Sequence, residues 1–210
     1  MKTANFLETW RARPMARVSG DYVTGTWVID PQRSAVRFWI RHLIAKKVLG
    51  VFTEFDGQMA TRPDVTKSSV QASVQVRSMD TFNAGRDEGT LAKDPFDAEN
   101  HPAITYTSTA ITPGDSGFRI DGSLTIRGVT RPVGLAVTQI RFERDADGRH
   151  DVHLRATGQV NRQDFGVRFA VPLDRQGVLA GNRVDIELDV TARLLDAHDD
   201  DLQSERVGGK

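Results

Sequence analysis

Apolar and polar positions alternate along most of this chain, and the alternation is clearest over residues 118–133. On one side of the pattern stand Phe118, Ile120, Gly122, Leu124 and Ile126. A period of two places them on one face of an extended strand, with the polar residues between them on the other face. Gly122 leaves this apolar face without a side chain, which predicts either a closely crossing strand or an open interior at that point. Both alternatives indicate a curved sheet.

The same period predicts about eight or nine strands in one antiparallel series. They are expected near residues 22–29, 36–42, 50–59, 70–77, 104–108, 118–126, 133–142, 152–160 and 184–194. Asp30 and Pro31 are typical of a turn, so the first two strands are expected to form a hairpin. The apolar phase slips between Val137 and Ile140, which predicts a β-bulge there.

The alternation stops between Met79 and Ala103. Within this gap, residues 86–93 are expected to form about two helical turns, weakened by Gly89 and ended by Pro95. Long connections inside compact domains tend to be functional. We predict that residues 86–96 form a mobile lid whose order depends on ligand, and a rigid plug at the barrel end is the alternative.

These elements predict an all-β fold, an eight-stranded antiparallel lipocalin-like barrel with a short helical insertion. An up-and-down barrel buries one face of every strand and has no open edge. With about eight strands, the interior holds either side chains or one small ligand. Small inward residues favour an apolar channel over a filled core, which is the alternative; these residues are Ala72, Gly122, Ala156 and Gly158.

Composition narrows the function classes. The 28 basic and 28 acidic residues balance, so no net charge would concentrate nucleic acid. The chain has no cysteine, which excludes disulfides and thiolate chemistry, and it shows no secretory or membrane-spanning apolar run. We therefore expect a soluble, cytoplasmic protein with an arm at residues 1–20, a barrel at 21–195 and a disordered polar tail at 196–210. No nucleic acid or integral membrane segment is expected, and a homodimer is compatible with the sequence.

Four blocks of residues, in their order and spacing, resemble the YceI-like family. Members of this family are soluble lipocalin-like barrels that bind polyisoprenoids and related amphiphiles. The first block has Trp27, Asp30, Ser34, Val36, Phe38, His42, Gly50, Phe52, Phe55 and Gly57, and the second has Ser78, Thr81, Arg86, Asp87, Leu91, Asp94, Phe96, Asp97, Pro102, Ile104 and Tyr106. The third spans residues 122–133 and the fourth residues 161–166. Gly89 departs from the pattern, because many relatives carry a histidine there. Many relatives are also periplasmic.

The resemblance implies an eight-stranded antiparallel barrel with a helical insertion and a lipid tail in its lumen. No cofactor or metal is expected from the residues themselves. We predict that this protein binds a polyisoprenoid, an isoprenoid quinone or a fatty-chain lipid for storage, transport or stress response. The expected ligand-binding residues are Phe38, Ile40, His42, Phe52, Val74, Arg86, Leu91, Phe96, Ile104, Tyr106, Phe118, Ile120, Leu124, Ile126, Leu135, Phe169 and Leu188.

Charged residues and histidines near the expected barrel ends allow other interpretations. His42 shares the apolar phase of its strand and is more typical of a hydrogen-bonded core residue than of a base. Arg86, Asp87, Asp94 and Asp97 are expected in a salt-bridged and capping loop, although Arg86 could meet a ligand oxygen. Arg162 and Asp164 are expected to form a buried ion pair. His150 and His153 lie three residues apart on a strand, on opposite faces, so they do not chelate one metal.

Two alternative functions remain open at this point. One is a hydrolase or isomerase of a lipid-like substrate, with His42 as base and Asp87, Asp94 or Asp97 as its partner. No nucleophile elbow, phosphate loop or dinucleotide motif supports it, and we expect no catalytic role for His42. The other is a packed barrel that serves as a protein-interaction module.

Overall fold

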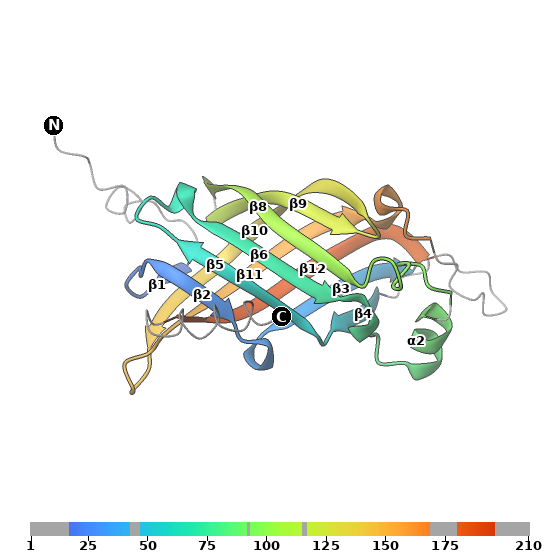
Figure 1. Cartoon of the computed structure of the whole chain (residues 1–210), viewed down its shortest axis with the longest axis horizontal. Coiled ribbons are helices and arrows are strands. Elements are labelled where there is room, and N and C mark those ends of the chain that lie inside the picture. Colours follow the sequence, from blue (N-terminus) through green and yellow to red (C-terminus); the bar gives the residue numbers. More distant parts are fainter. Residues whose placement is uncertain (1–16, 43–46, 92, 115–116, 169–179, 196–210) are drawn as a thin grey trace, which may run out of the picture.

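The structure is a computed structural model that describes residues 17–42, 47–91, 93–114, 117–168 and 180–195. Strands dominate it (Figure 1). They are β1 (Arg17–Ser19), β2 (Gly25–Ile29), β3 (Ala35–His42), β4 (Lys47–Phe52), β5 (Phe55–Thr61), β6 (Ser69–Gln75), β7 (Met79–Asp80), β8 (Ala103–Gly114), β9 (Gly117–Ile126), β10 (Val129–Arg144), β11 (His150–Asn161) and β12 (Ala180–Leu194). The helices are η1 (Pro31–Arg33), η2 (Val65–Lys67), η3 (Val76–Ser78), α2 (Ala84–Leu91) and η4 (Arg162–Phe165).

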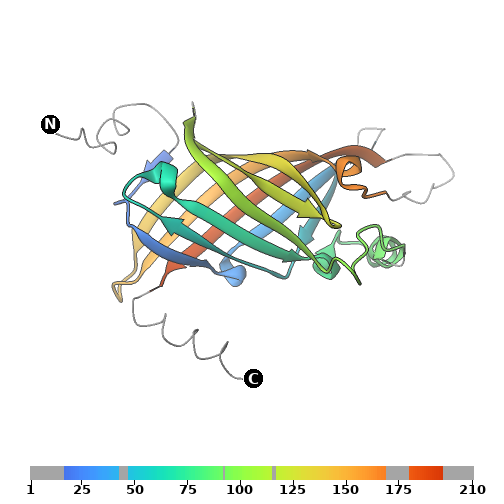
Figure 2. The same cartoon turned by 45° about the horizontal axis from the view of Figure 1, so that its top comes forward.

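The strands close into one antiparallel barrel (Figure 2). β2 and β3 both pair with β12. On their other side, β5 pairs with β2 and β4 pairs with β3. Next in the barrel, β6 pairs with β5 and β7 pairs with β4. Each of these three pairs of segments is therefore one interrupted barrel strand. β8, β9, β10, β11 and β12 follow in order, and β12 closes the circle. The expected eight-stranded barrel is confirmed, with β1 added in parallel to β10.

Two local predictions about strands are wrong. In both cases a short irregular segment interrupts a barrel strand, and the chain then continues in the same direction. Asp30 accepts a hydrogen bond from the Gln32 backbone N–H at 3.0 Å and begins η1, after which the chain continues along β12. The expected hairpin at Asp30 is therefore an interruption of one strand. The expected single strand over residues 50–59 is also interrupted, between Phe52 and Phe55.

Irregular pairing helps the sheet to curl. β10 has one extra residue between Val137 and Gln139 relative to β11, which confirms the predicted bulge. A second shift, between Ser108 and Ala110 of β8 relative to β9, was not predicted. It extends β8 to Gly114 and places Ile111 in the core. Such bulges increase local twist and help barrels to close.

The helical insertion lies at one end of the barrel in both views (Figures 1 and 2). α2 begins two residues before the expected helix start and ends at Leu91. The Asp87 carboxylate accepts hydrogen bonds from the backbone N–H and hydroxyl of Thr81. Asp94 accepts the backbone N–H of Ala98 at 2.8 Å. These carboxylates therefore hold the turns on both sides of α2, as the capping interpretation predicted. The barrel end with α2 and η4 is called the α2 end below.

The opposite end of the barrel is filled by aromatic rings and is called the Trp27 end. Trp27 has no exposed surface and contacts Phe142 edge-on at a centroid distance of 5.7 Å. Tyr22 also contacts Phe142 edge-on, at a centroid distance of 5.4 Å. The Trp27 indole N–H donates to Thr61 Oγ1 at 2.8 Å, which satisfies its polar group. This end of the barrel is therefore a packed core.

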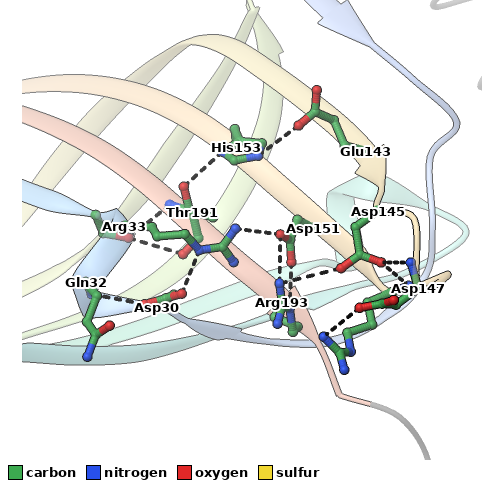
Figure 3. A network of polar contacts seen from close by, with 12 residues as sticks. Asp30, Gln32, Arg33, Glu143, Asp145, Asp147, Asp151, His153, Thr191 and Arg193 are labelled. Atoms are coloured by element: carbon green, nitrogen blue, oxygen red, sulfur yellow. Dashed lines mark hydrogen bonds and ion pairs between the residues drawn. The ribbon is translucent and has the colours of Figure 1, made fainter.

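A network of ion pairs crosses the outer wall near the break between β2 and β3 (Figure 3). Asp151 of β11 lies between two guanidinium groups, with contacts of 2.9 Å from Arg193 Nε and 2.6 Å from Arg33 Nη1. Arg33 also contacts Asp30 at 2.7 Å. Arg193 and Arg33 hold the pKa of Asp151 well below its usual range, although burial opposes them. The network links η1, β11 and β12.

Candidate functional site

A cavity of about 260 Å³ occupies the barrel interior on the α2 side of the packed Trp27 end. Side chains from all eight barrel strands, α2 and η4 line it, and most of them are apolar. The polar members of the lining are Arg37, Asp56, Thr81, Thr90, Tyr106 and Arg162. The barrel is thus neither wholly filled nor wholly hollow. An apolar cavity of this size is suited to a narrow apolar ligand.

Most of the residues expected to bind ligand lie in this lining. They are Phe38, Ile40, Phe52, Val74, Phe96, Ile104, Tyr106, Ile120, Leu124, Ile126, Leu135 and Leu188. Phe169 lies outside the described residues, and so do the side chains of His42, Arg86 and Leu91. Their contact with a ligand stays a prediction for all of them.

Phe118 does not line the cavity, although its alternation phase is correct. It is buried at 7% exposure, opposite Val137 of β10 and in the same core cluster as Ile111. This position on β9 lies on the Trp27 side of Ile120, beyond the part of the barrel that is hollow. Alternation identifies the face of a strand that points inward, but not the depth at which the interior becomes filled.

The inward residues of β12 show the transition from hollow to filled. Val184, Ile186 and Leu188 line the cavity and keep partly accessible side chains. Val190 follows on the same face, buried at the inner limit of the cavity lining, and Ala192 beyond it is completely buried and does not line the cavity. Apolar surface that remains accessible inside a barrel is surface that a ligand can still bury.

Two aromatic rings lie over glycines in the cavity wall. A Cβ at Gly122 would lie 2.4 Å from Tyr106 Cζ, and one at Gly50 would lie 2.1 Å from Phe38 Cζ. The expected opening at Gly122 is therefore wrong, because the Tyr106 ring fills the space, while the close approach of another strand is seen as the Thr107 carbonyl oxygen of the paired strand β8, 2.7 Å from the same Cβ position. The Tyr106 hydroxyl donates toward the carbonyls of Ile120 at 3.1 Å and Val133 at 3.2 Å. Burial raises the pKa of Tyr106 to about 12.

Three of the polar lining residues lie at the α2 end, namely Thr81, Thr90 and Arg162. Arg162 of η4 is buried, and its guanidinium donates to the carbonyls of Gly181 at 3.1 Å and Val167 at 3.2 Å. Burial lowers the pKa of Arg162. The expected ion pair between Arg162 and Asp164 is wrong, because Asp164 is exposed on the turn that Asn161 caps. The cavity therefore has an apolar body and a more polar α2 end.

Comparison with known proteins is consistent with this architecture. A family model, the YceI-like domain, matches residues 27–192. The chain belongs to the YceI-like family. Among curated relatives, a UPF0312 protein of Azotobacter vinelandii is 30% identical over 71% of this chain and 80% of its own length. A UPF0312 protein of Vibrio cholerae is 29% identical over 84% of this chain and 89% of its own length.

Solved structures of low sequence identity share the YceI-like fold. BcnA of Burkholderia cenocepacia has a TM-score of 0.65 at 24% identity and covers 78% of this chain and 98% of its own. A polyisoprenoid binding domain from Saccharophagus degradans has a TM-score of 0.58 at 13% identity and covers 82% of this chain and all of its own. At these identities the likeness concerns the fold of the barrel.

Some lining residues of this YceI-like barrel were missed by the analysis of its sequence. Many of them stand on the predicted apolar faces and were simply not selected, such as Ile29, Val70, Ala156 and Ile186. Others lie where alternation stops, and they are Met79, Thr81, Thr90, Arg162 and Val167. In this second group, Thr81 and Arg162 belong to the blocks that resemble the family, whereas no such signal marks Met79, Thr90 and Val167 in the sequence.

One of the histidines considered for metal binding, His153, is held by structural contacts. His153 lies between Thr191 Oγ1 at 2.9 Å and Glu143 Oε2 at 3.1 Å on the outer wall (Figure 3). Within the described residues, no group of three or more histidines and carboxylates could hold a metal ion. The described helices include none that is long and apolar enough to span a membrane.

Proposed function

We propose that this YceI-like protein binds one long-chain apolar ligand, such as a polyisoprenoid, an isoprenoid quinone or a fatty-acid derivative, and does no chemistry on it. The observation that carries the proposal is the cavity, which combines inward residues of every barrel strand into an almost wholly apolar lining. Burial of each methylene group there contributes about 0.8 kcal/mol. A chain can therefore be held without many polar contacts.

The polarity of the lining supports an orientation for this ligand. Its tail would lie toward Ile29 and Val190, where the cavity meets the packed Trp27 end. Its polar head would lie at the α2 end, near Thr81, Thr90 and Arg162. A head group at the other end would meet buried aromatic rings, and an unpaired polar group there costs about 1–3 kcal/mol. The family and the fold of the Saccharophagus polyisoprenoid binding domain also support a lipid ligand.

Prenyl alcohols of increasing chain length test the proposal. Native mass spectrometry should show one ligand per chain, with the ligand recovered at unchanged mass. Affinity measured by titration should rise with each added isoprene unit until the cavity is filled, and then level off. Leu124→Arg should lose the complex, because it places a charge in the cavity wall. Absence of any complex along the series would contradict binding, and conversion of the ligand would favour the enzyme alternative.

A further inference from the structure

Phe82 stands out from the other apolar residues of the molecule. This residue is 67% exposed. Among the described residues, no other large hydrophobic residue is exposed to this extent. It lies between β7 and α2, one residue after Thr81, which is buried and lines the cavity. Thr81 thus faces the cavity, and the next residue, Phe82, faces the solvent. The exposed ring is placed directly beside the wall of the ligand site.

The backbone at Phe82 is held in an unusual conformation. Its φ is 59°, in the left-handed region that bulky side chains rarely adopt. Asp80 Oδ1 accepts the Phe82 backbone N–H at 2.7 Å, and the Asp87 carboxylate holds the backbone N–H and hydroxyl of Thr81. Strained residues of this kind persist where their surroundings fix them, and they concentrate at functional sites. Here the two carboxylates fix a turn that directs an aromatic ring outward.

The surroundings of the ring favour an apolar, uncharged contact. Residues 81–85 carry no charged side chain, and Asn83, Ala84 and Gly85 are exposed beside Phe82. Insertion limited to the Phe82 ring and these uncharged neighbours buries no charge, provided that the Asp80 carboxylate, which accepts the Phe82 backbone N–H, stays on the water side. Aromatic rings are favoured at the boundary between lipid head groups and acyl chains. A water-insoluble ligand of the proposed kind resides in such a boundary before it reaches a binding protein.

We propose that Phe82 docks the α2 end of the barrel on the surface of a lipid bilayer, so that ligand passes between the bilayer and the cavity without crossing water. The inference rests on the proposed function for its purpose. The docking contact itself does not depend on ligand. Insertion of one ring gives weak, reversible attachment, which suits a protein that must leave the surface once it is loaded.

Phe82→Trp tests the contact directly. Vesicles of phosphatidylcholine with brominated acyl chains should quench the new indole, with the quenching of the wild-type tryptophans subtracted. Phe82→Ala should bind the same vesicles about tenfold more weakly, since it loses most of the buried ring area. Thr112→Ala, an exposed residue on β8 toward the other end of the barrel, is the matched control and should leave vesicle binding unchanged.

Ligand transfer provides the second measurement. cis-Parinaric acid should move from phosphatidylcholine vesicles to Phe82→Ala about tenfold more slowly than to the wild type. Its affinity for the two proteins should be equal when it is added from ethanol, because Phe82 does not line the cavity. Absence of extra quenching in Phe82→Trp, or transfer to Phe82→Ala at the wild-type rate, overturns the inference. A protein that takes up no parinaric acid at all contradicts the proposed function, while the quenching experiment still decides the docking.

Discussion

Individual glycines set the shape of the cavity wall in this protein. Tyr106 and Phe38 lie flat over Gly122 and Gly50 because no side chain stands in their way. The ring of Tyr106 also satisfies its hydroxyl on backbone carbonyls and so remains in place. A missing side chain on one strand thus positions a large side chain on the next. Such pairing of a glycine with an aromatic neighbour is a known way to build curved sheets.

Gly122→Ala should therefore destabilise the fold by about 1–3 kcal/mol, measured by urea unfolding. The new methyl group would meet Tyr106 Cζ at 2.4 Å and the Thr107 carbonyl oxygen at 2.7 Å, and the backbone atom cannot rotate away. Gly85→Ala is the control, because the nearest atom to its Cβ is 3.8 Å away and helices favour alanine over glycine. Equal stability of Gly122→Ala and the wild type would contradict the close contact.

A charge placed in the cavity should weaken lipid uptake more than removal of a charge from the outer wall. Val74→Arg and Leu124→Arg introduce a guanidinium among lining residues, where an unpaired charge costs several kcal/mol. Arg119→Ala removes an exposed partner of Asp121, which contributes little. Titration with a fluorescent lipid, with folding checked by circular dichroism, compares the three variants. Equal loss of uptake in all of them would place the ligand outside the barrel.

At the scale of elements, the segment around α2 is anchored at two points and exposed between them. Asp87 holds its beginning to Thr81, and Phe96 is buried in the core at its end. Between these anchors, Glu88 and Lys93 are exposed, while Thr90 faces the cavity. Short segments with few buried contacts open more easily than the strands around them. The two anchors are what a rigid plug would need, whereas the exposed residues between them are what a mobile lid would need.

Hydrogen exchange separates these alternatives. We expect residues 86–96 to exchange faster without a bound prenyl alcohol than with one, and the difference to be largest between Asp87 and Phe96. Amides in β11 and β12 should change little and serve as the internal reference, because they belong to the central pairing of the barrel. Equal and strong protection of residues 86–96 in both samples would identify the segment as a rigid plug.

The ion-pair network ties η1 to β11 and β12 and should make stability depend on pH. The pKa of Asp151 is lowered in the folded protein, so its contribution to stability is complete above the ordinary aspartate value near 4 and is lost as pH falls below it. Asp151→Asn should destabilise the protein at pH 7 by about 2 kcal/mol and flatten the pH dependence below about pH 4. Thermal unfolding between pH 2 and 7 measures both effects. An unchanged pH profile in the variant would show that other carboxylates dominate acid unfolding.

For the whole molecule, alternation predicts the barrel because each strand has one apolar and one polar face. The predicted bulge at Val137 follows from the same pattern, since an extra residue shifts the phase. The hairpin expected at Asp30 was wrong because a turn signal does not say whether the chain reverses or continues. That choice is made by β12, which is long enough to pair with both β2 and β3. Whether the chain reverses therefore depends on residues more than 150 positions away in the sequence. One of them is Thr191, whose carbonyl accepts a hydrogen bond from Ser34 Oγ.

The cavity was predictable in its walls but not in its limits. Inward residues such as Leu124 and Leu188 follow from alternation alone. The inner limit of the cavity, at the Trp27 end, does not follow from alternation. It depends on how Trp27 and Phe142, which belong to strands far apart in the sequence, pack against each other. The contribution of Arg162 was also misassigned, since its carbonyl partners lie across a turn and on the next strand. Packing between distant residues has no periodic signature.

The packed Trp27 end makes the proposed binding site a blind channel. Among the described residues, the packed Trp27 end leaves no passage beyond the Trp27–Phe142 contact, so a tail that enters at the α2 end is expected to leave by the same end, and a new ligand cannot push the old one through. Exchange must then proceed by full departure followed by entry, and the rate at which a loaded protein releases its ligand should not depend on the concentration of the competing ligand. If the proposed ligand binds there, we expect a barrel of this kind to take up and release it in discrete loads and not to conduct a continuous flow of lipid.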